Sequence, residues 1–324
     1  MAFHIVIPDN LDEAGLNVLR AASDVTIQAA AKMSRAELLA AAPSADALII
    51  RSASTIDREV IDAAARLKVV GRAGVGVDNV DLVAATERGI VVMNAPDGNT
   101  VATAELALGL MLALARHIPQ AEISMRAGQW EKKAFMGVEL RGKTLGIVGF
   151  GRIGRAVARR ALAFEMTVIA YDPFVSPETG AAHGAEMVSL DELYARSDFI
   201  TLHAAVTPEN RKMINAESLR KMKRGVRIVN DSRGALIDEA ALAAAIADGH
   251  VAGAAIDVYS QEPPPPDNPL LALPNVIHTP HLGASTYEAQ DEVATQIAHN
   301  VLDALRQREY RNVVNPDVLK HTGV

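Results

Sequence analysis

The feature that most constrains this chain is a glycine-rich turn almost halfway along it. Three glycines stand in the spacing G-x-G-x-x-G at Gly149, Gly151 and Gly154. They follow an apolar run that ends at Val148 and precede a helical pattern that begins at Arg152. Glycine permits a tight turn and a close approach of the backbone to a ligand, and the helix that follows presents free N–H groups to an anion. This context predicts a nucleotide-binding strand–turn–helix unit in a parallel sheet.

An acidic residue after the turn extends this prediction to a dinucleotide. Asp172 stands 18 residues after Gly154, at the end of the next apolar run, TVIAYD. At this position a carboxylate binds the ribose hydroxyls of NAD, and it repels the 2′-phosphate of NADP. The following Pro173-Phe174 offers no arginine to bind a phosphate, so the sequence favours NAD. A turn that binds no nucleotide is the alternative, and the position of the acid weighs against it.

Composition favours a small molecule as partner. The chain has 324 residues, a formal net charge of −7 and no cysteine. The acidic net charge argues against nucleic acid or an anionic membrane surface as partner. The most apolar segment, 106–115, is too short to span a bilayer and is expected to be a buried helix. Without cysteine there is no disulfide, iron–sulfur cluster or thiolate zinc site, so we expect a cytoplasmic protein without a metal.

Apolar runs with strand character alternate with helical patterns along the chain. The first series has strands at 3–7, 47–50, 68–70 and 90–93 and helices at 11–22, 35–41 and 57–65. After one long helix from Thr100 to about Met125, a second series begins at Thr144, with strands at 167–171, 199–202, 227–230 and 253–258 and helices at 152–164, 190–196, 216–222 and 239–248. The alternation predicts an α/β fold with two doubly wound parallel-sheet units. A last helix at 285–306 is expected to pack back onto the first unit.

Three chemically active side chains follow the predicted strands of the second series. Arg233 and Glu262 each come shortly after a strand, and His281 precedes the last helix. An arginine binds a carboxylate by two parallel hydrogen bonds, and a histidine oriented by a carboxylate shuttles a proton near neutral pH. Each also has an ordinary alternative: a surface arginine, a solvated loop acid, or a loop histidine, His278 included, whose hydrogen bonds are satisfied. Spacing alone does not decide between these alternatives.

Five motifs resemble those of a known family. They are GRAGVGVDNVDL at 71–82, TLHAAV at 201–206, NDSRGALIDE at 230–239, DVYSQEPP at 257–264 and PHLGASTYEAQ at 280–290. On these motifs the chain resembles the D-isomer-specific 2-hydroxyacid dehydrogenases, from the first strand to about Asn315. The resemblance implies a Rossmann NAD-binding domain, residues 99–285, inserted into a flavodoxin-like substrate-binding domain, residues 1–98 and 286–324.

The resemblance also implies a set of site residues. The catalytic set is Arg233, Glu262 and His281. The cofactor-binding residues are Val75, Gly149, Gly151, Arg152, Ile153, Gly154, Asp172, Ala204, Asp231, Ser232, Arg233, Asp257, His281, Gly283 and Ala284. The substrate-binding residues are Arg51, Arg72, Gly74, Val75, Asn99 and Lys133, of which Lys133 approaches the substrate from a partner subunit.

The function implied by the resemblance is NAD-dependent hydride transfer at C2 of a D-2-hydroxy acid. The basic residues Arg51, Arg72 and Lys133 favour a phosphorylated acid, so the expected reaction oxidises 3-phospho-D-glycerate to 3-phosphooxypyruvate, the first step of serine biosynthesis. The alternative within the family is a reductase of glyoxylate, hydroxypyruvate or another 2-oxo acid. The alternative from another class is an NAD(H)-sensing binding protein with a dehydrogenase fold.

A homodimer is expected from one loop. The segment QWEKKAFMG at 129–137 is expected to expose Trp130 and Phe135 between charged residues, a pattern typical of a subunit contact. A loop that folds onto its own domain is the alternative.

The chain departs from the family pattern at three points. Ala204 and Ala205 replace the usual Thr-Pro, and Asp231 stands where the family more often has a small uncharged residue. The extra carboxylate is expected to alter cofactor affinity. The sequence ends at Val324, without the regulatory domains that many phosphoglycerate-oxidising members carry after this core, so feedback by serine is not expected.

Overall fold

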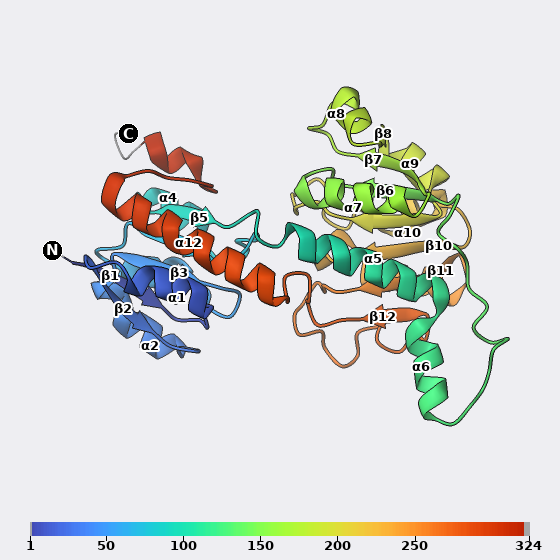
Figure 1. The fold of residues 1–324 in the computed structure, drawn as a ribbon, viewed down its shortest axis with the longest axis horizontal. Helices are drawn as coiled ribbons and strands as arrows, with labels where there is room; N and C mark the ends of the chain where they lie inside the picture. The colour runs from blue at the N-terminus through green and yellow to red at the C-terminus, as the bar shows by residue number, and fades with distance from the viewer. Residues whose placement is uncertain (1, 321–324) are drawn as a thin grey trace. The chain divides into compact units, whose positions relative to one another are not determined.

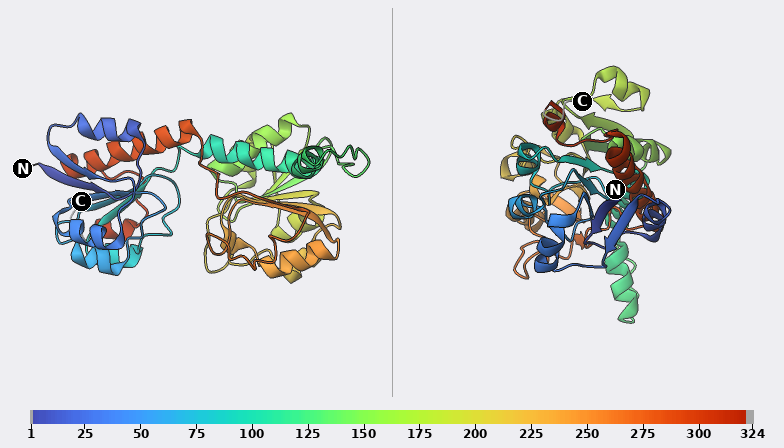
Figure 2. Two further views of the ribbon diagram at one scale, coloured as in Figure 1. Left: turned by 90° about the horizontal axis from the view of Figure 1, so that it is seen from below. Right: turned by 90° about the vertical axis from the view of Figure 1, so that its left-hand side faces the viewer.

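The computed structural model describes residues 2–320 and divides into two compact units. The first unit comprises Met1–Asn99 and Thr286–Val324, and the second comprises Thr100–Ser285. Each unit contains one parallel sheet between two layers of helices (Figures 1 and 2). The predicted fold class, α/β with two doubly wound parallel sheets, is therefore confirmed. The functions assigned to the two predicted domains stay predictions at this point.

The sheet of the first unit has the strand order β2-β1-β3-β4-β5. Its strands are β1 (Phe3–Ile7), β2 (Val25–Ala29), β3 (Ala47–Ile50), β4 (Val69–Arg72) and β5 (Val91–Asn94). One face packs against α1 (Glu13–Arg20) and α12 (Tyr287–Gln307), and the other against α2 (Arg35–Ala41), α3 (Arg58–Ala63) and α4 (Leu82–Glu87). Short 3₁₀ turns are η1 (Ala42–Ser44) and η3 (Pro316–Lys320). This is the flavodoxin-like order, in which ligands bind at the carboxyl ends of the strands.

The last long helix, α12, packs on the first unit, as expected from the sequence. Two glycines allow the close approach. A Cβ added to Gly15 of α1 would lie 2.7 Å from the carbonyl oxygen of Ala294, and one added to Gly71 of β4 would lie 2.6 Å from Cγ2 of Val301. Any larger side chain at either position would push α12 away from the sheet, so this contact ties the end of the described chain to its beginning.

The sheet of the second unit has the order β12-β11-β10-β9-β6-β7-β8. Its strands are β6 (Thr144–Val148), β7 (Thr167–Tyr171), β8 (Glu186–Met187), β9 (Phe199–Leu202), β10 (Val226–Asn230), β11 (Val251–Ile256) and β12 (Val276–His278). One face packs against α5 (Thr100–Arg116) and α7 (Arg152–Ala163), and the other against α9 (Leu190–Arg196), α10 (Ala216–Lys221) and α11 (Glu239–Ala247). The remaining elements are α6 (Ile118–Arg126), α8 (Pro177–Ala182) and η2 (Gly234–Leu236). The order is that of a Rossmann fold with one added strand, and the winding reverses between β6 and β9.

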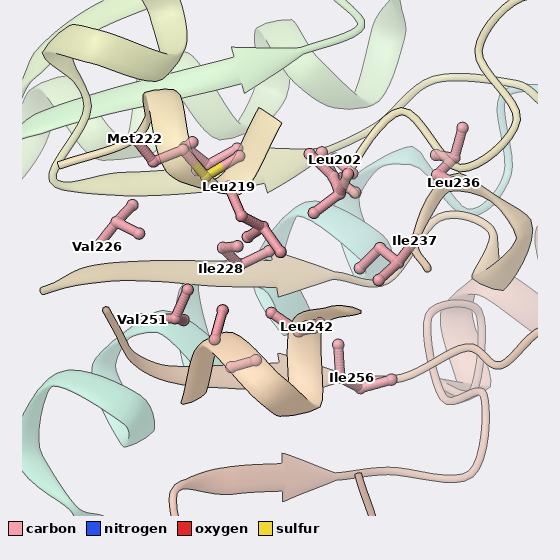
Figure 3. Packing of buried hydrophobic residues seen from close by; sticks show 14 of the residues in the cluster. Leu202, Leu219, Met222, Val226, Ile228, Leu236, Ile237, Leu242, Val251 and Ile256 are labelled. Carbon is pink, nitrogen blue, oxygen red and sulfur yellow. The ribbon is translucent and has the colours of Figure 1, made fainter. Parts of the chain in front are cut away.

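The core on the α10–α11 face of this sheet anchors the segment that carries Arg233. In it, side chains from the two helices pack over β10 and β11 (Figure 3). Leu236 and Ile237 are buried in the same cluster. Because both follow Arg233 within four residues, the segment that carries Arg233 is anchored to a packed core.

The predicted long helix from Thr100 to about Met125 is wrong. The segment forms two helices, α5 and α6, whose axes are bent by 63° (Figure 1). His117 between them has a left-handed backbone with φ 53°, and Pro119, next in the first turn of α6, lacks the N–H that a continuous helix needs. The segment 106–115 lies within α5 and contributes Leu108, Met111 and other residues to the core, as expected.

Several short elements were not predicted. They are β2, β8, β12, α4 and α8. In β2, half-buried Val25 and Ile27 alternate with exposed residues, but the strand lies at the edge of its sheet and contains no fully buried residue. The strand β8 has only two residues. Among residues 2–320, no single helix is long and apolar enough to cross a membrane; only the bent pair α5–α6 reaches that length and composition.

Candidate active site

The predicted site residues of the second unit lie along one edge of its sheet. The strands are in register at their carboxyl ends, where Leu202 pairs with Val148 and with Asn230, Asn230 with Ile256, and Ile256 with His278. The residues that come directly after these ends therefore form one row: Gly149, His203, Asp231, Asp257 and Thr279. Ligands of open α/β sheets bind at this edge.

The glycine turn leaves space at its second glycine and none at the other two. Gly149 has φ 90°, and a Cβ there would lie 2.6 Å from the carbonyl of His203. A Cβ on Gly154 would lie 2.2 Å from the carbonyl oxygen of Gly149, whereas a Cβ on Gly151 meets no atom within 4 Å. Gly151 is the N-cap of α7 and supplies no side-chain cap. The N–H groups at the start of α7, which begins with Arg152 and Ile153, therefore face a position that suits an anion.

Asp172 links the glycine turn to the end of β7. Its carboxylate accepts hydrogen bonds from the N–H of Phe150 at 2.8 Å and from the N–H of Phe174 at 2.9 Å. A carboxylate accepts about four hydrogen bonds, so this group keeps acceptor capacity for ribose hydroxyls. The acid thus lies beside the turn, which is the placement that the dinucleotide interpretation requires.

Glu262 and His281 form a hydrogen-bonded pair at the surface of the second unit. Nδ1 of His281 lies 2.7 Å from Oε2 of Glu262, and the two side chains are 49% and 39% exposed. Burial raises the pKa of Glu262, but the hydrogen bonds from His281 and from the Tyr259 N–H, together with the charge of Arg233, outweigh it, so the pKa lies below its ordinary value. Because Glu262 engages Nδ1, Nε2 is the ring nitrogen left for a reactant.

Buried Asp257 holds the loop that carries His281. The N–H of His281 donates to the carbonyl of Asp257 at 2.8 Å. The Asp257 carboxylate accepts from Oγ1 of Thr279 at 2.6 Å and from the N–H groups of Leu282 and Gly283 at 2.7 and 3.0 Å. His281 itself has φ 58°, a left-handed conformation that costs a non-glycine residue about 1–2 kcal/mol. These four hydrogen bonds hold the loop in that conformation.

Arg233 lies in a turn that packs against the start of the Glu262 loop. Its carbonyl accepts from the side chain of Asn230 at 3.0 Å, and Oγ of Ser232 donates to the carbonyl of Ala204 at 2.8 Å. A Cβ on Gly234 would lie 1.9 Å from the carbonyl carbon of Tyr259, so the two backbones are in direct contact. The structure therefore brings together Arg233, Glu262 and His281. The sequence identified these residues as candidates but did not show that they lie close together.

Asp231 and His203 form a second, fully buried pair. Both side chains are 0% exposed, and Nδ1 of His203 lies 3.4 Å from Oδ1 of Asp231, while its Nε2 lies 2.9 Å from Oγ1 of Thr201. Burial and the charge of Asp257 raise the pKa of Asp231 well above its ordinary value, and burial lowers the pKa of His203 to about 3. His203 is therefore neutral near pH 7, and burial favours the neutral acid at Asp231. Among the described residues, neither carboxyl oxygen of Asp231 nor Nδ1 of His203 has a hydrogen-bond partner. The role of Asp231 in cofactor binding stays a prediction.

The residues predicted to bind substrate are divided between the two units. Arg51 follows β3 and Arg72 ends β4, and because Ile50 pairs with Arg72, both arginines lie at the carboxyl edge of the first sheet. Arg51 donates through Nη1 to the carbonyl of Asn10 at 2.9 Å. The guanidinium of Arg72 lies over Gly74, since a Cβ there would meet its Nη1. The others are Val75, whose carbonyl accepts from Asn94, Asn99 at the end of the first part of this unit, and Lys133, exposed in the second unit.

Known proteins resemble this chain over most of its length. Residues 108–283 match the family described as D-isomer specific 2-hydroxyacid dehydrogenase, NAD binding domain. The chain belongs to the D-isomer-specific 2-hydroxyacid dehydrogenases. The matched residues lie inside the second unit, so this member of the family contains an NAD-binding domain with the glycine turn described above.

Curated relatives and solved structures agree with this assignment. The D-3-phosphoglycerate dehydrogenases of Archaeoglobus fulgidus and Methanocaldococcus jannaschii are 50% and 49% identical to it, each over 96% of this chain. The chain spans 59% of the length of both relatives. Among solved structures, a glyoxylate reductase from Paecilomyes thermophila is 35% identical with a TM-score of 0.88, covering 97% of this dehydrogenase and 99% of that chain. A Thermus thermophilus protein is 40% identical, also with a TM-score of 0.88, covering 96% of this dehydrogenase and all of that chain.

Sequence reasoning did not identify His203, Thr279 or Tyr259 as parts of the site. His203 directly follows a predicted strand, so its position was a usable signal. Thr279 follows β12, which was not predicted, so its position gave no such signal. Tyr259 gave no such signal, because its partner, His278, is distant in the sequence. His278 was considered a satisfied loop histidine; it is the last residue of β12 instead, and its Nδ1 is hydrogen-bonded to Tyr259.

The substitution Asp231→Asn tests the neutral buried pair. A carboxyl whose pKa is raised on folding contributes stability below its unfolded value of about 3.9, and that contribution is lost as the pH rises toward the folded value. Asparagine keeps the shape of the side chain without titrating. We expect the variant to gain stability over the parent protein, and the gain to be larger at about pH 9 than at about pH 5 by at least about 1 kcal/mol in urea unfolding.

Asp198→Asn is the matched control. Burial raises the pKa of Asp198, but the Thr144 N–H and Lys223 outweigh it and lower the pKa overall. This variant is therefore expected to lose stability near neutral pH, with the loss shrinking in acid. A gain for Asp231→Asn that is the same at both pH values would show that Asp231 is ionised in the folded protein.

Proposed function

We propose that this protein is an NAD-dependent dehydrogenase that oxidises 3-phospho-D-glycerate to 3-phosphooxypyruvate. The observation that carries the proposal is the cluster of Arg233, Glu262 and His281 at the same sheet edge as the glycine turn. The relatives named D-3-phosphoglycerate dehydrogenase support the choice of substrate. A glyoxylate reductase is the second candidate, favoured by the structural neighbour of that name.

Each residue of the cluster has a role in the proposed reaction. NAD, when bound, accepts the hydride. Nε2 of His281 takes the proton of the C2 hydroxyl while the C–H electron pair leaves C2 as hydride, so that a C=O bond forms. Glu262 orients the imidazole and stabilises its protonated form. Arg233 binds the substrate carboxylate through two parallel hydrogen bonds and polarises the oxygen on C2.

Asp172 is proposed to select NAD over NADP. Its carboxylate lies beside the glycine turn, where the 2′-phosphate of NADP would be repelled. We expect higher turnover with NADH than with NADPH. The substitution Asp172→Ala is expected to weaken NADH binding and to reduce the preference for NADH over NADPH. Steady-state kinetics with both cofactors measures this, and a parent protein that prefers NADPH would contradict the role of Asp172.

A phosphorylated substrate is proposed because of the cations at the edge of the first sheet. A phosphate monoester carries nearly two negative charges at neutral pH, and a chain of net charge −7 must supply local cations to bind it. Arg51 and Arg72 lie at that edge, at the ends of neighbouring strands. Lys133 is proposed as a third cation, delivered by a partner subunit.

The substitution Arg51→Ala tests this substrate assignment. Loss of a charge-assisted hydrogen bond is expected to raise KM for 3-phosphooxypyruvate roughly 10- to 150-fold. Activity on hydroxypyruvate and glyoxylate, which lack the phosphate, should change little. Arg88→Ala is the control, because Arg88 is the C-cap of α4 and pairs with Asp62. Equal losses on all three substrates would contradict phosphate binding by Arg51, and a parent protein that prefers glyoxylate would favour the second candidate.

A homodimer is proposed through α6 and the loop that follows it. Large apolar side chains are exposed there: Ile118, Ile123, Met125, Trp130 and Met136, with exposures of 52–79%. Phe135, expected to be exposed, is half-buried. A concentration of exposed apolar side chains in one segment is typical of an interface that a second subunit covers.

The substitution Trp130→Glu is expected to disrupt this dimer. A buried charge without a partner strongly disfavours association. Light scattering at micromolar concentration should show a dimer for the parent protein and a monomer for the variant. Phe174→Glu, which changes a residue that is 94% exposed elsewhere in the second unit, should leave the dimer intact. A monomeric parent protein would refute the proposal.

A further inference from the structure

A buried tyrosine and a histidine are hydrogen-bonded directly behind the Glu262–His281 pair. The hydroxyl of Tyr259 lies 2.8 Å from Nδ1 of His278, and the two rings are stacked with centroids 6.4 Å apart. Tyr259 follows β11 and His278 ends β12, two strands paired at Ile256 and His278. Tyr259 is only 7% exposed, so water cannot readily replace His278 as the partner of its hydroxyl. Loss of His278 would therefore leave a buried hydroxyl without a hydrogen bond, which lowers stability.

Burial keeps both groups of this hydrogen bond neutral. Burial, with the charges of Glu239, Asp257 and Glu262, raises the pKa of Tyr259 to about 12, so the hydroxyl keeps its proton. Burial lowers the pKa of His278, so its ring is neutral near pH 7. The bond therefore joins two neutral groups, and the tautomer of His278 sets which of them donates.

The backbone of Tyr259 contacts both halves of the catalytic cluster. Its N–H donates to Oε1 of Glu262 at 3.1 Å, while Oε2 of the same carboxylate faces His281. Its carbonyl carbon lies against Gly234, the residue after Arg233. The position of the Tyr259 backbone therefore sets one of the two hydrogen bonds that orient the Glu262 carboxylate.

The remainder of this loop is anchored separately. The carboxylate of Glu239 accepts from the N–H of Ser260 at 2.7 Å and from the side chain of Asn268 at 2.8 Å. Glu239 thus holds the loop on either side of Glu262, and the bond between Tyr259 and His278 holds it where it leaves the sheet. Loss of that bond would free the Tyr259 N–H without unfolding the loop.

We propose that Tyr259 and His278 are positioning residues for the acid/base step. Their hydrogen bond fixes the Tyr259 N–H against Glu262, and so holds Glu262 in the orientation in which it binds Nδ1 of His281. The proposal rests on the proposed function in that it assigns the pair to that reaction, but the geometry of Glu262 is measurable without any substrate.

The first test is Tyr259→Phe, which removes the hydroxyl and keeps the ring. With a weaker bond to the Tyr259 N–H, the pKa of Glu262 should rise, because that bond stabilises the carboxylate. A ¹³C NMR titration of the Glu262 carboxyl measures this in the intact protein. In kinetics with NADH and 3-phosphooxypyruvate or hydroxypyruvate, kcat should fall roughly two- to tenfold with KM unchanged, and the acid limb of the kcat/KM profile should move to higher pH.

Two sets of variants separate positioning from general stability. Tyr194→Phe is the matched control, since Tyr194 is also buried and donates to the carbonyl of Met213 at 3.3 Å; it should lose stability without moving the Glu262 titration. His278→Leu should reproduce Tyr259→Phe, and the double variant should be no worse than either single one. His278→Gln offers a new acceptor to the hydroxyl and should restore the parent pH profile.

The reference variant His281→Ala distinguishes failure of this proposal from failure of the proposed function. Deleting the proton acceptor should lower kcat by roughly 10²–10⁴-fold. If His281→Ala keeps its turnover, or the parent protein turns over neither substrate, the proposed function is wrong and the NMR titration alone decides the positioning role. If His281→Ala loses turnover while Tyr259→Phe matches Tyr194→Phe in both kinetics and titration, the positioning proposal is overturned.

Discussion

The in-register parallel pairing of β6, β9, β10, β11 and β12 is the constraint on which the site depends. Because the strands end level with one another, the residue after each end lies beside its neighbour. The contacts of that row follow in order: Gly149 against His203, His203 against Asp231, and Asp257 bonded to Thr279. The loops that carry Arg233, Glu262 and His281 all start from this row, so a shift in the register of one strand would separate them.

The row is polar and buried, so it lowers the stability of the fold where it is unpaired and holds the adjoining loops where it is paired. A buried polar group destabilises the fold unless it is paired, and here the pairing differs from residue to residue. The Asp257 carboxylate accepts three hydrogen bonds, and they fix the His281 loop. Asp231 and His203 are instead not hydrogen-bonded to each other, and burial raises the pKa of Asp231 and lowers that of His203. The same low-dielectric surroundings make each bond of the row strong, so the loops above it are held in one arrangement.

In the first unit, level strand ends likewise place loop residues side by side, but these residues are basic. Its strands β3 and β4 also end level, which places Arg51 and Arg72 at one edge. Buried Asp9 organises the turn after β3 by accepting from the N–H of Arg51 and from the hydroxyl of Ser54. In both units a packed parallel sheet positions loop residues, and the difference in chemistry comes from those residues alone.

The sequence by itself determined the local helices and strands and the residues whose side chains can take part in binding or catalysis. The strands 3–7, 47–50, 167–171 and 199–202 and the helices 35–41 and 190–196 were predicted with the bounds that the structure shows, because an apolar run between turn residues is a local signal. The glycine turn and Asp172 were recognisable for the same reason. Arg233, Glu262 and His281 could be named as candidates from their positions, but only the resemblance to a family joined them as one catalytic set, since nothing in their spacing brings them together.

Only the tertiary structure decided which residues meet. The pair Asp231–His203 and the bond from Tyr259 to His278 were not predictable from sequence. The break at His117 did have a local signal in Pro119, which the prediction of one long helix overlooked. Asp231 and His203 are 28 positions apart, and Tyr259 and His278 are 19 apart; the members of each pair lie at or shortly after the ends of different strands. Their contacts depend on the register between strands that pair through the backbone. Backbone pairing is the same for every side chain, so a sequence pattern carries little information about it.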